Sequence, residues 1–270
     1  MFIENTQHFD LKQTFECGQC FRWNEQQDGE YIGVVGNYVM GAKNVNGGIE
    51  IICADDFFAA QYFDMDGDYA KRKNKLQCDE IIVKAITNGH GIRLLKQQPW
   101  ETLVSFIIST NNNIPRIKKI IELLCENFGD KLIHSNKIYY SFPTAETLAE
   151  LNVTDLAVIR CGYRDKFIID AAKKVASGEI NLQKISNMSL EQGRSELKKV
   201  TGVGDKVAEC VLLFAYQKYD AFPKDVWVKR VFDRLYSVDE EDIDSFVRDK
   251  FGDLCGLAQQ YLFYYGRQLL

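Results

Sequence analysis

Residues 197–210 read LKKVTGVGDKVAEC and place two glycines, Gly202 and Gly204, between two stretches of helical pattern. Both glycines tolerate a positive φ and neither carries a Cβ, so the backbone amides of this glycine turn (residues 201–204) can approach a phosphate closely. The helix that follows directs its N-terminal amides toward the same place. We therefore predict a phosphate-binding turn between two helices, with an ordinary helix connection as the alternative.

Asp225 lies nineteen residues beyond Lys206, within residues 223–230, which read PKDVWVKR. It precedes a predicted helix that runs to about Leu235, and as the N-cap of that helix its ionised form gains ~0.3–1 kcal/mol. Capping alone would be a sufficient role for it. Together, however, the glycine turn, the lysine and the aspartate resemble the helix-hairpin-helix glycosylase superfamily, in which such a turn holds one DNA strand without reading its sequence.

The flanking sequence predicts an α+β fold. Residues 31–53 are rich in β-branched and aromatic residues and contain glycine turns, which indicates short antiparallel strands. From Pro99 onward, apolar residues recur at helical spacing. We expect an N-terminal antiparallel-sheet lobe at residues 1–95, followed by an all-helical helix-hairpin-helix glycosylase body at residues 96–270. Residues 109–113 read STNNN, and because such side chains compete for backbone hydrogen bonds, we expect a polar elbow between two helices there.

The chain is mildly acidic, with a formal net charge of -5. Nucleic-acid-binding domains usually carry a basic excess, so a DNA site here must be local. We expect the basic residues to gather near the glycine turn and the elbow, and the acidic residues 239–242 to lie elsewhere. These basic residues are Lys198, Lys199, Lys224, Lys229 and Arg230 near the turn, and Arg116, Lys118 and Lys119 near the elbow.

The eight cysteines and the N-terminal residues favour an intracellular, soluble protein of the cytoplasm, nucleoid or nucleus. Met1–Asn5 lacks a basic start followed by an apolar run, and no apolar stretch approaches the ~20 residues of a membrane span. Cys17 and Cys20 are spaced like half of a zinc site, but the chain has no second matching pair and only three histidines. We therefore expect no metal and no cofactor.

Residues 17–23 read CGQCFRW and resemble the SGQSFRW element of the 8-oxoguanine DNA glycosylase family, a likeness that extends over most of the chain. The resemblance implies that the carbonyl of Gly18 accepts a hydrogen bond from the proton on N7 of the oxidised base. Ordinary guanine lacks that proton and would leave the buried carbonyl unsatisfied, at a cost of ~1–3 kcal/mol. Without the resemblance, Gly18 would be a turn residue.

The same resemblance assigns residues to the opposite strand and to the base. Asn111 and Arg116 would contact the orphaned cytosine, Tyr163 would act as a wedge in the base stack, and Arg164 would be a second cytosine contact. The alternative for these residues is a solvated loop with surface arginines. Within residues 256–263, GLAQQYLF, the resemblance assigns the base to Gln259 and Phe263, with core packing as the alternative for Phe263. Gln259 would bind the pairing edge, Phe263 would stack on one face, and Cys210 would close the other.

The implied activity is that of a bifunctional DNA glycosylase/AP lyase that excises 8-oxoguanine, preferably opposite cytosine, in base-excision repair. Lys206 would attack the extruded nucleotide's anomeric carbon as a neutral amine, and Asp225 would stabilise the developing positive charge. A lysine-sugar Schiff base would then permit β-elimination, which nicks the strand. The expected partner is double-stranded DNA containing oxidised guanine, and we expect a monomer with no obligate protein partner and no membrane association.

Three rival hypotheses stay open. A glycosylase for alkylated purines on the same scaffold would use water and would not need Lys206. A non-catalytic DNA-binding or scaffolding protein would keep only the glycine turn. An acidic helical interaction protein would bind no DNA, so it would lack the salt-dependent duplex binding that phosphate contacts produce. One departure from eukaryotic relatives is Trp227, where they have a histidine, and no contact is assigned to it.

Overall fold

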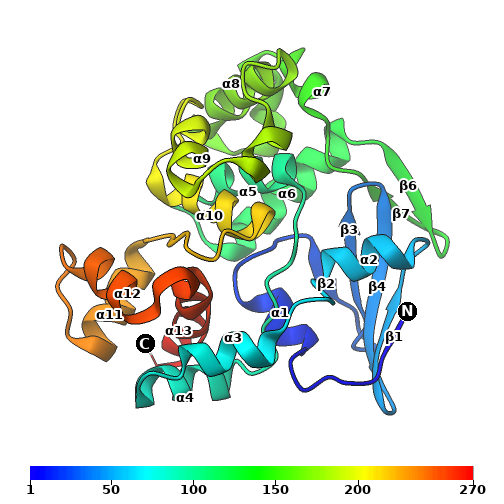
Figure 1. The fold of residues 1–270 in the computed structure, drawn as a ribbon. Coiled ribbons are helices and arrows are strands. Elements are labelled where there is room, and N and C mark those ends of the chain that lie inside the picture. The colour runs from blue at the N-terminus through cyan, green and yellow to red at the C-terminus, as the bar shows by residue number, and fades with distance from the viewer. Residues whose placement is uncertain (270) are drawn as a thin grey trace.

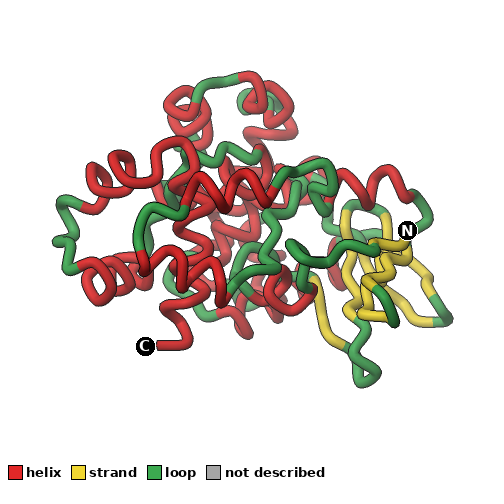
Figure 2. The backbone as a smooth tube through the Cα atoms, turned by 60° about the horizontal axis from the view of Figure 1, so that its bottom comes forward, coloured by secondary structure: helices red, strands yellow, loops and turns green. Residues whose placement is uncertain are grey.

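The computed structural model describes residues 1–269, which form an antiparallel sheet at one end and helices over most of the rest (Figure 1). The same division is clear when the backbone is turned, with the strands gathered at one end (Figure 2). This confirms the predicted α+β class. Strands β2 to β5 pair in chain order and β1 adds to β5. The five strands are β1 (Phe2–Ile3), β2 (Trp23–Glu25), β3 (Tyr31–Val35), β4 (Tyr38–Val45) and β5 (Gly48–Ile52).

The α-helices fall into a group of four that accompanies the sheet in sequence and a longer series from Pro99 onward. The first group is α1 (Leu11–Glu16), α2 (Asp56–Tyr62), α3 (Tyr69–Leu76) and α4 (Glu80–Asn88). The second group is α5 (Pro99–Ser109), α6 (Ile114–Phe128), α7 (Ala145–Ala149), α8 (Asp165–Ala176), α9 (Leu190–Leu197), α10 (Asp205–Tyr216), α11 (Val226–Tyr236), α12 (Ile243–Phe251) and α13 (Cys255–Leu269).

The sheet packs around Trp23, which positions the segment between α1 and β2. Trp23 lies opposite Gly33 on β3, where a Cβ would come within 2.4 Å of the indole, so only glycine fits. The indole stacks on Phe15 of α1 with 4.2 Å between ring centroids, and its Nε1 donates to the Tyr62 hydroxyl at 2.9 Å. Residues 17–22, which join α1 to β2, are therefore held at both ends.

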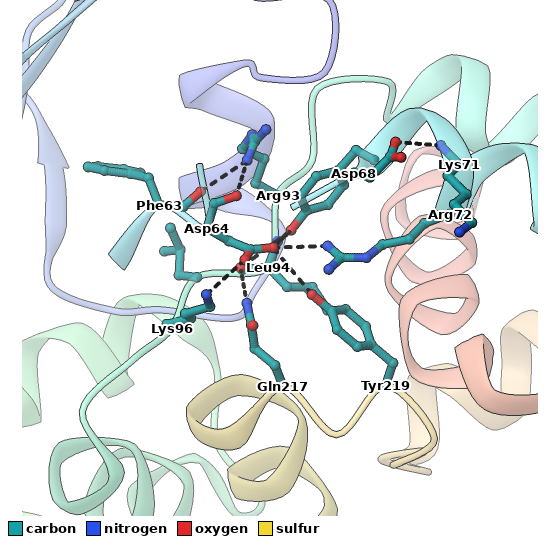
Figure 3. A network of polar contacts seen from close by, with 12 residues as sticks. Phe63, Asp64, Asp68, Lys71, Arg72, Arg93, Leu94, Lys96, Gln217 and Tyr219 are labelled. Carbon is teal, nitrogen blue, oxygen red and sulfur yellow. Dashed lines mark hydrogen bonds and ion pairs between the residues drawn. The ribbon is translucent and has the colours of Figure 1, made fainter. Parts of the chain in front are cut away.

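A buried carboxylate links the segment after α2 to the segment after α10 (Figure 3). Asp64 is only 2% exposed. It accepts hydrogen bonds from Arg72 at 2.9 Å, from Tyr69 at 3.0 Å and from Tyr219 at 3.3 Å, and pairs with Lys96 at 3.1 Å. Burial alone would raise the pKa of Asp64, but Arg72 and Lys96 outweigh it and lower that pKa. The network therefore stabilises the ionised carboxylate where these parts of the chain meet.

The elbow and the caps follow the expectation. α5 ends at Ser109 and α6 begins at Ile114, with Asn113 accepting from the Arg116 amide at 3.0 Å. Asn111 has φ +48, a left-handed conformation that asparagine tolerates better than most residues. The elbow therefore separates the largely buried α5 from the half-exposed α6 with a polar loop that turns at Asn111.

The region between α6 and α8 departs from the expectation of helices alone. Residues 131–140 form a β-hairpin made of β6 (Lys131–His134) and β7 (Lys137–Tyr140). Its two turn residues, Ser135 and Asn136, have φ +48 and +60, the paired positive values of a tight hairpin turn. Four short stretches are 3-10 helices, namely η1 (Val153–Ile159), η2 (Gly162–Arg164), η3 (Leu182–Asn187) and η4 (Gly252–Leu254).

Among residues 1–269, none of the helices combines the length and the apolar character that crossing a lipid bilayer requires. Within the same residues, no cluster of three or more His, Cys, Asp and Glu side chains is arranged to hold a metal ion. The thiols of Cys17 and Cys20 donate instead to carbonyls of α1, at Thr14 and Phe15.

Candidate active site

The glycine turn connects α9 to α10 at residues 201–204, and its two glycines serve different purposes. Gly202 has φ +83, and a Cβ there would lie 2.5 Å from the Phe167 ring, so both conformation and space require glycine. Gly204 has φ −99 and is the extended N-cap of α10, so of the two glycines only Gly202 uses the positive φ that both tolerate. A Cβ at Gly204 would meet no atom of residues 1–269 within 4 Å, so the backbone of the turn is uncovered at this position.

Lys206 lies in the first turn of α10 and is half-buried. Its Nζ donates to the Ser109 hydroxyl at 3.0 Å, and it lies 5.2 Å from the centroid of the Phe106 ring. Both partners belong to α5, whose last turn ends at the elbow. Lys206 also borders a cleft of about 500 Å³, which none of the residues assigned to the damaged base lines. The two contacts hold the amine against the last turn of α5.

Asp225 is the N-cap of α11, as predicted, and its Oδ1 accepts from the Val228 amide at 2.8 Å. Both this carboxylate and the lysine influence the buried Cys210 thiol. Burial raises the pKa of Cys210 to about 12, with the Lys206 ammonium lowering it and the Asp225 carboxylate raising it.

Gly18 and Phe263 also come together, although 245 positions separate them in the sequence. A Cβ at Gly18 would lie 3.3 Å from Cε1 of Phe263, so the ring lies directly against the glycine backbone. Gly18 has φ +86, which L side chains rarely adopt. On the adjoining turn of α13, Gln260 donates to the Cys17 carbonyl at 2.7 Å. The 17–22 segment is therefore tied to α13 beside Phe263.

Gln259 is 6% exposed, and its Oε1 accepts no hydrogen bond within the described chain. Leaving a buried acceptor unsatisfied costs ~1–3 kcal/mol, which a bound donor would recover. Gln19, which sequence reasoning did not single out, is fully satisfied. Its side chain donates to the carbonyls of Thr14 and Arg93 and accepts from the Leu95 amide, all within 2.9 Å. Gln19 therefore fixes the backbone next to Gly18.

Arg164 is buried and binds the elbow. Its Nε donates to the Thr110 carbonyl, one terminal nitrogen to the Cys161 carbonyl, and the other to the Asn111 carbonyl, each at 3.0 Å. In this arrangement Arg164 holds the loop that presents Asn111, and its contact with cytosine stays a prediction. Arg116 lies at the start of α6 and is exposed.

Tyr163 precedes Arg164 and is 54% exposed. Its ring lies 4.5 Å from the Arg164 guanidinium carbon and 6.0 Å from the Phe167 ring, edge to face. Phe167 in turn packs against Gly202. The exposed tyrosine, the elbow and the glycine turn are thereby connected through adjoining side chains.

The expected separation of charge is wrong in part. Lys229 pairs with Glu240, a member of the acidic run, and Lys224 pairs with Asp244 at 2.7 Å. The reason is that only residues 237–242 join α11 to α12, so the acidic run folds back toward α11. Lys198 pairs with Asp205 at 2.6 Å across the glycine turn. Basic and acidic side chains alternate around the turn.

Besides Gln19 and Gln260, further residues that contact the site were not predicted, among them Ser109, Phe167, Arg194 and Glu209. Ser109 stands in the elbow that the sequence did reveal, and a hydroxyl at a helix end is its only sequence signal. Glu209 stands three residues after Lys206 and so shares its helix face, but a glutamate there equally suits a solvent-facing position. These contacts depend on tertiary structure.

Two family models cover most of the chain. Residues 1–103 match the model described as 8-oxoguanine DNA glycosylase, N-terminal domain, and residues 104–256 match that of the HhH-GPD superfamily base excision DNA repair proteins. Among curated proteins, the N-glycosylase/DNA lyase of Saccharomyces cerevisiae is 31% identical over 263 residues, covering 87% of this chain and 70% of the yeast protein.

Solved structures resemble the whole chain. MBOgg1 in complex with a low-affinity DNA ligand is 48% identical with a TM-score of 0.95, over 99% of this chain and 95% of that one. The 8-oxoguanine glycosylase/lyase of Clostridium acetobutylicum, in complex with double-stranded DNA containing cytosine opposite 8-oxoguanine, is 42% identical. Its TM-score is 0.93, over 100% of this chain and 98% of the other.

Proposed function

The chain belongs to the HhH-GPD superfamily of base excision DNA repair proteins, and from this premise we propose the roles of its residues in excising 8-oxoguanine and nicking the strand. It is a DNA glycosylase with AP lyase activity that acts on 8-oxoguanine in duplex DNA. The observation that carries the assignment of the centre is the Lys206 amine, which the Ser109 hydroxyl holds at the end of α5, just beyond the glycine turn.

Lys206 is the nucleophile in this proposal. Its Nζ forms a bond to C1′ of the damaged nucleotide while the bond from C1′ to N9 breaks, and the electron pair leaves with the base, which takes up a proton. Asp225 stabilises the positive charge that develops on the sugar. Loss of a proton and ring opening give the lysine-sugar Schiff base. Removal of a 2′ proton then expels the 3′ phosphate and nicks the strand.

The base binds between Phe263 and Cys210, with Gln259 at its pairing edge and Gly18 reading N7. The unsatisfied Oε1 of Gln259 supports this role, since 8-oxoguanine offers N–H donors on that edge. The close approach of Gly18 to Phe263 supports a shared wall for the base. A carbonyl held rigidly by neighbouring hydrogen bonds discriminates best, because it cannot turn away from the lone pair of ordinary guanine.

The cytosine opposite the lesion is contacted by Asn111, Arg116 and Arg164. Tyr163 fills the gap that the extruded base leaves in the stack. The exposure of Tyr163 and its backing by Phe167 support a wedge. Gly202 and Gly204 let the amides at the start of α10 hold a phosphate of the damaged strand. We further propose that the protein acts as a monomer without an obligate protein partner, and that its two domains divide between residues 95 and 96, just ahead of α5.

One panel of duplexes tests the proposed function. 8-Oxoguanine is placed opposite each of the four bases, beside a duplex with an alkylated purine, and excision and borohydride trapping are measured. We expect fastest excision opposite cytosine and a covalent complex that Lys206→Gln abolishes. Lys84→Gln is the control and should trap normally, since Lys84 is an exposed lysine of α4 that pairs with Glu80 and is assigned no contact with DNA. Undiminished trapping by Lys206→Gln would remove Lys206 as nucleophile, and excision of the alkylated base alone would favour the rival glycosylase.

A further inference from the structure

Glu209 is a buried carboxylate in the second turn of α10, three residues beyond Lys206 and only 5% exposed. Its Oε1 accepts from Nε of Arg194 on α9 at 2.5 Å, and its Oε2 accepts from the Phe222 amide at 2.7 Å. One carboxylate therefore joins α9 and α10, the helices on either side of the glycine turn, to the loop that leads into α11.

That loop, residues 217–225, determines where Asp225 stands. Phe222 lies three residues before Asp225, and Pro223 between them has its φ fixed by its ring. The Phe222 ring packs edge to face on Phe232 of α11, with 5.6 Å between centroids. A shift of the Phe222 backbone would therefore be passed on to the aspartate and to the first turn of α11.

The start of the loop is fixed from another direction. The Gly256 amide donates to the Tyr219 carbonyl at 2.8 Å, and a Cβ at Gly256 would lie 2.2 Å from the Ala221 carbonyl oxygen. α13 thus anchors residues 219–221. Between this anchor and α11, the hydrogen bond from the Phe222 amide to Glu209 ties the loop directly to the helix that carries the nucleophile.

We propose that Glu209 is a positioning residue that sets the separation between the Lys206 amine and the Asp225 carboxylate by holding the Phe222 amide to α10. This inference rests on the proposed function. Arg194 supplies the opposite charge that makes the buried carboxylate tolerable, since an unpaired buried charge is strongly unfavourable. Because both Glu209 oxygens are occupied within the protein, the residue acts through Asp225 and not on the substrate.

The geometry separates this role from that of Lys206. The lysine is placed by α10 and by Ser109, neither of which depends on the loop. Loosening the loop should therefore impair charge stabilisation during base release more than the attack of lysine on an abasic site that is already formed. If Glu209 had a merely structural role, its substitution would slow both steps to the same extent.

The test compares Glu209→Ala and Glu209→Gln with the control Glu191→Gln in the chain of 270 residues. Glu191 is the other carboxylate partner of Arg194, but its side chain is 77% exposed and it does not touch the loop. Four quantities are measured: single-turnover excision of 8-oxoguanine, borohydride trapping on a preformed abasic site, duplex affinity and melting temperature. Excision is assayed well below the melting temperature of every variant.

We expect excision to slow by about 10- to 100-fold in Glu209→Ala, the scale of a displacement of about 1 Å in a catalytic group. Glu209→Gln keeps an acceptor for the Phe222 amide and loses the charge, so it should fall between Glu209→Ala and the wild type. Trapping on the abasic site and duplex affinity should change by no more than about twofold, and Glu191→Gln should resemble the wild type throughout.

Excision within about twofold of wild type in folded Glu209→Gln and Glu209→Ala would overturn the inference. So would a parallel loss of excision, trapping and affinity, because that pattern marks a structural role. If Glu209→Ala does not fold, the Glu209→Gln ratio of excision to trapping decides alone. A wild-type chain that neither excises nor traps would instead reject the proposed function, which is a different observation from any ratio between variants.

Discussion

Gly18 shows how much one residue contributes at this site. Its φ of +86 is easily reached only by glycine, and its Cα faces the Phe263 ring. The resemblance of CGQCFRW to a family element predicted a functional glycine at this position. Neither residue type nor spacing could predict that the ring of a residue 245 positions away would lie against it, because that contact depends on how α13 packs beside the 17–22 segment.

Gly18→Ala should impair excision beyond its effect on stability. The left-handed backbone costs about 1–2 kcal/mol for a residue with a Cβ, and the methyl group would also push the Phe263 ring from the base site. Gly29→Ala is the matched control, since Gly29 has φ +81 and a Cβ there would meet none of the described atoms within 4 Å. We expect similar melting temperatures for the two variants but excision slower by about 10-fold or more only in Gly18→Ala. Equal excision rates would contradict a role for Gly18 in the base site.

Ser109 was not predicted, yet it is the hydrogen-bond partner of the proposed nucleophile. Ser109→Ala should leave the fold intact and misdirect the amine, because Phe106 offers only its ring face in place of the hydroxyl. We expect borohydride trapping on 8-oxoguanine DNA to slow by about 10-fold, the upper end of what one hydrogen bond between neutral groups contributes. Ser245→Ala removes a comparable hydroxyl at the start of α12 and should trap normally. Unchanged trapping in Ser109→Ala would show that α10 alone places the lysine.

At the scale of elements, the sequence predicted what local chemistry decides. Asp225 caps α11 and the STNNN stretch ends α5, because side chains of these types compete for the backbone amides beside them. The β6–β7 hairpin was missed because its turn, Ser135 and Asn136, contains no glycine although both residues adopt positive φ. The burial of Arg164 under the elbow could not be predicted either, since a surface arginine has the same sequence pattern.

The two glycines of the turn give different predictions for stability, although both substitutions should weaken duplex binding. Gly202→Ala places a methyl group 2.5 Å from the Phe167 ring on a left-handed backbone. We expect the free energy of unfolding to fall by about 2 kcal/mol or more, which lowers the melting temperature by roughly 4–8 °C. Duplex binding should also weaken. Gly204→Ala meets open space with an ordinary φ, so its melting temperature should change little, but the methyl group would stand where a phosphate approaches α10. Duplex affinity at low salt, measured for both, tests this, and full affinity in Gly204→Ala would contradict a phosphate at that position.

At the scale of the whole molecule, the Asp64 network decides whether the parts of the site stay in register. It links the segment after α2, which follows the sheet, to Tyr219, whose carbonyl is also held by α13 (Figure 3). Asp64 and Tyr219 are 155 positions apart, so no sequence window could relate them. Both walls of the proposed base site, the 17–22 segment and α13, depend on parts of the chain that this carboxylate holds together.

The pKa of Asp64 predicts how acid affects stability. Because Arg72 and Lys96 lower this pKa below its ordinary value, the carboxylate stabilises the fold at any pH above that ordinary value, about 3.9. The contribution is lost as the pH falls through the lowered value of the folded state. Asp64→Asn removes this contribution at neutral pH. We expect the free energy of unfolding to fall by about 2 kcal/mol, which lowers the melting temperature by roughly 4–8 °C. The loss is no larger because the cationic partners of Asp64 are partly solvated.

The difference in melting temperature between wild type and Asp64→Asn should therefore be constant from pH 7 down to about 5 and shrink below about 4. Asp253→Asn is the control, because Asp253 pairs with Lys75 on the surface with its side chain 68% exposed, and exposed pairs contribute little at any pH. A difference for Asp64→Asn that is independent of pH down to 3 would mean that the shape of the side chain matters and its charge does not. Excision by Asp64→Asn at 25 °C should fall more than its folded fraction does, because the network holds the segments that carry Gly18 and Phe263 against each other.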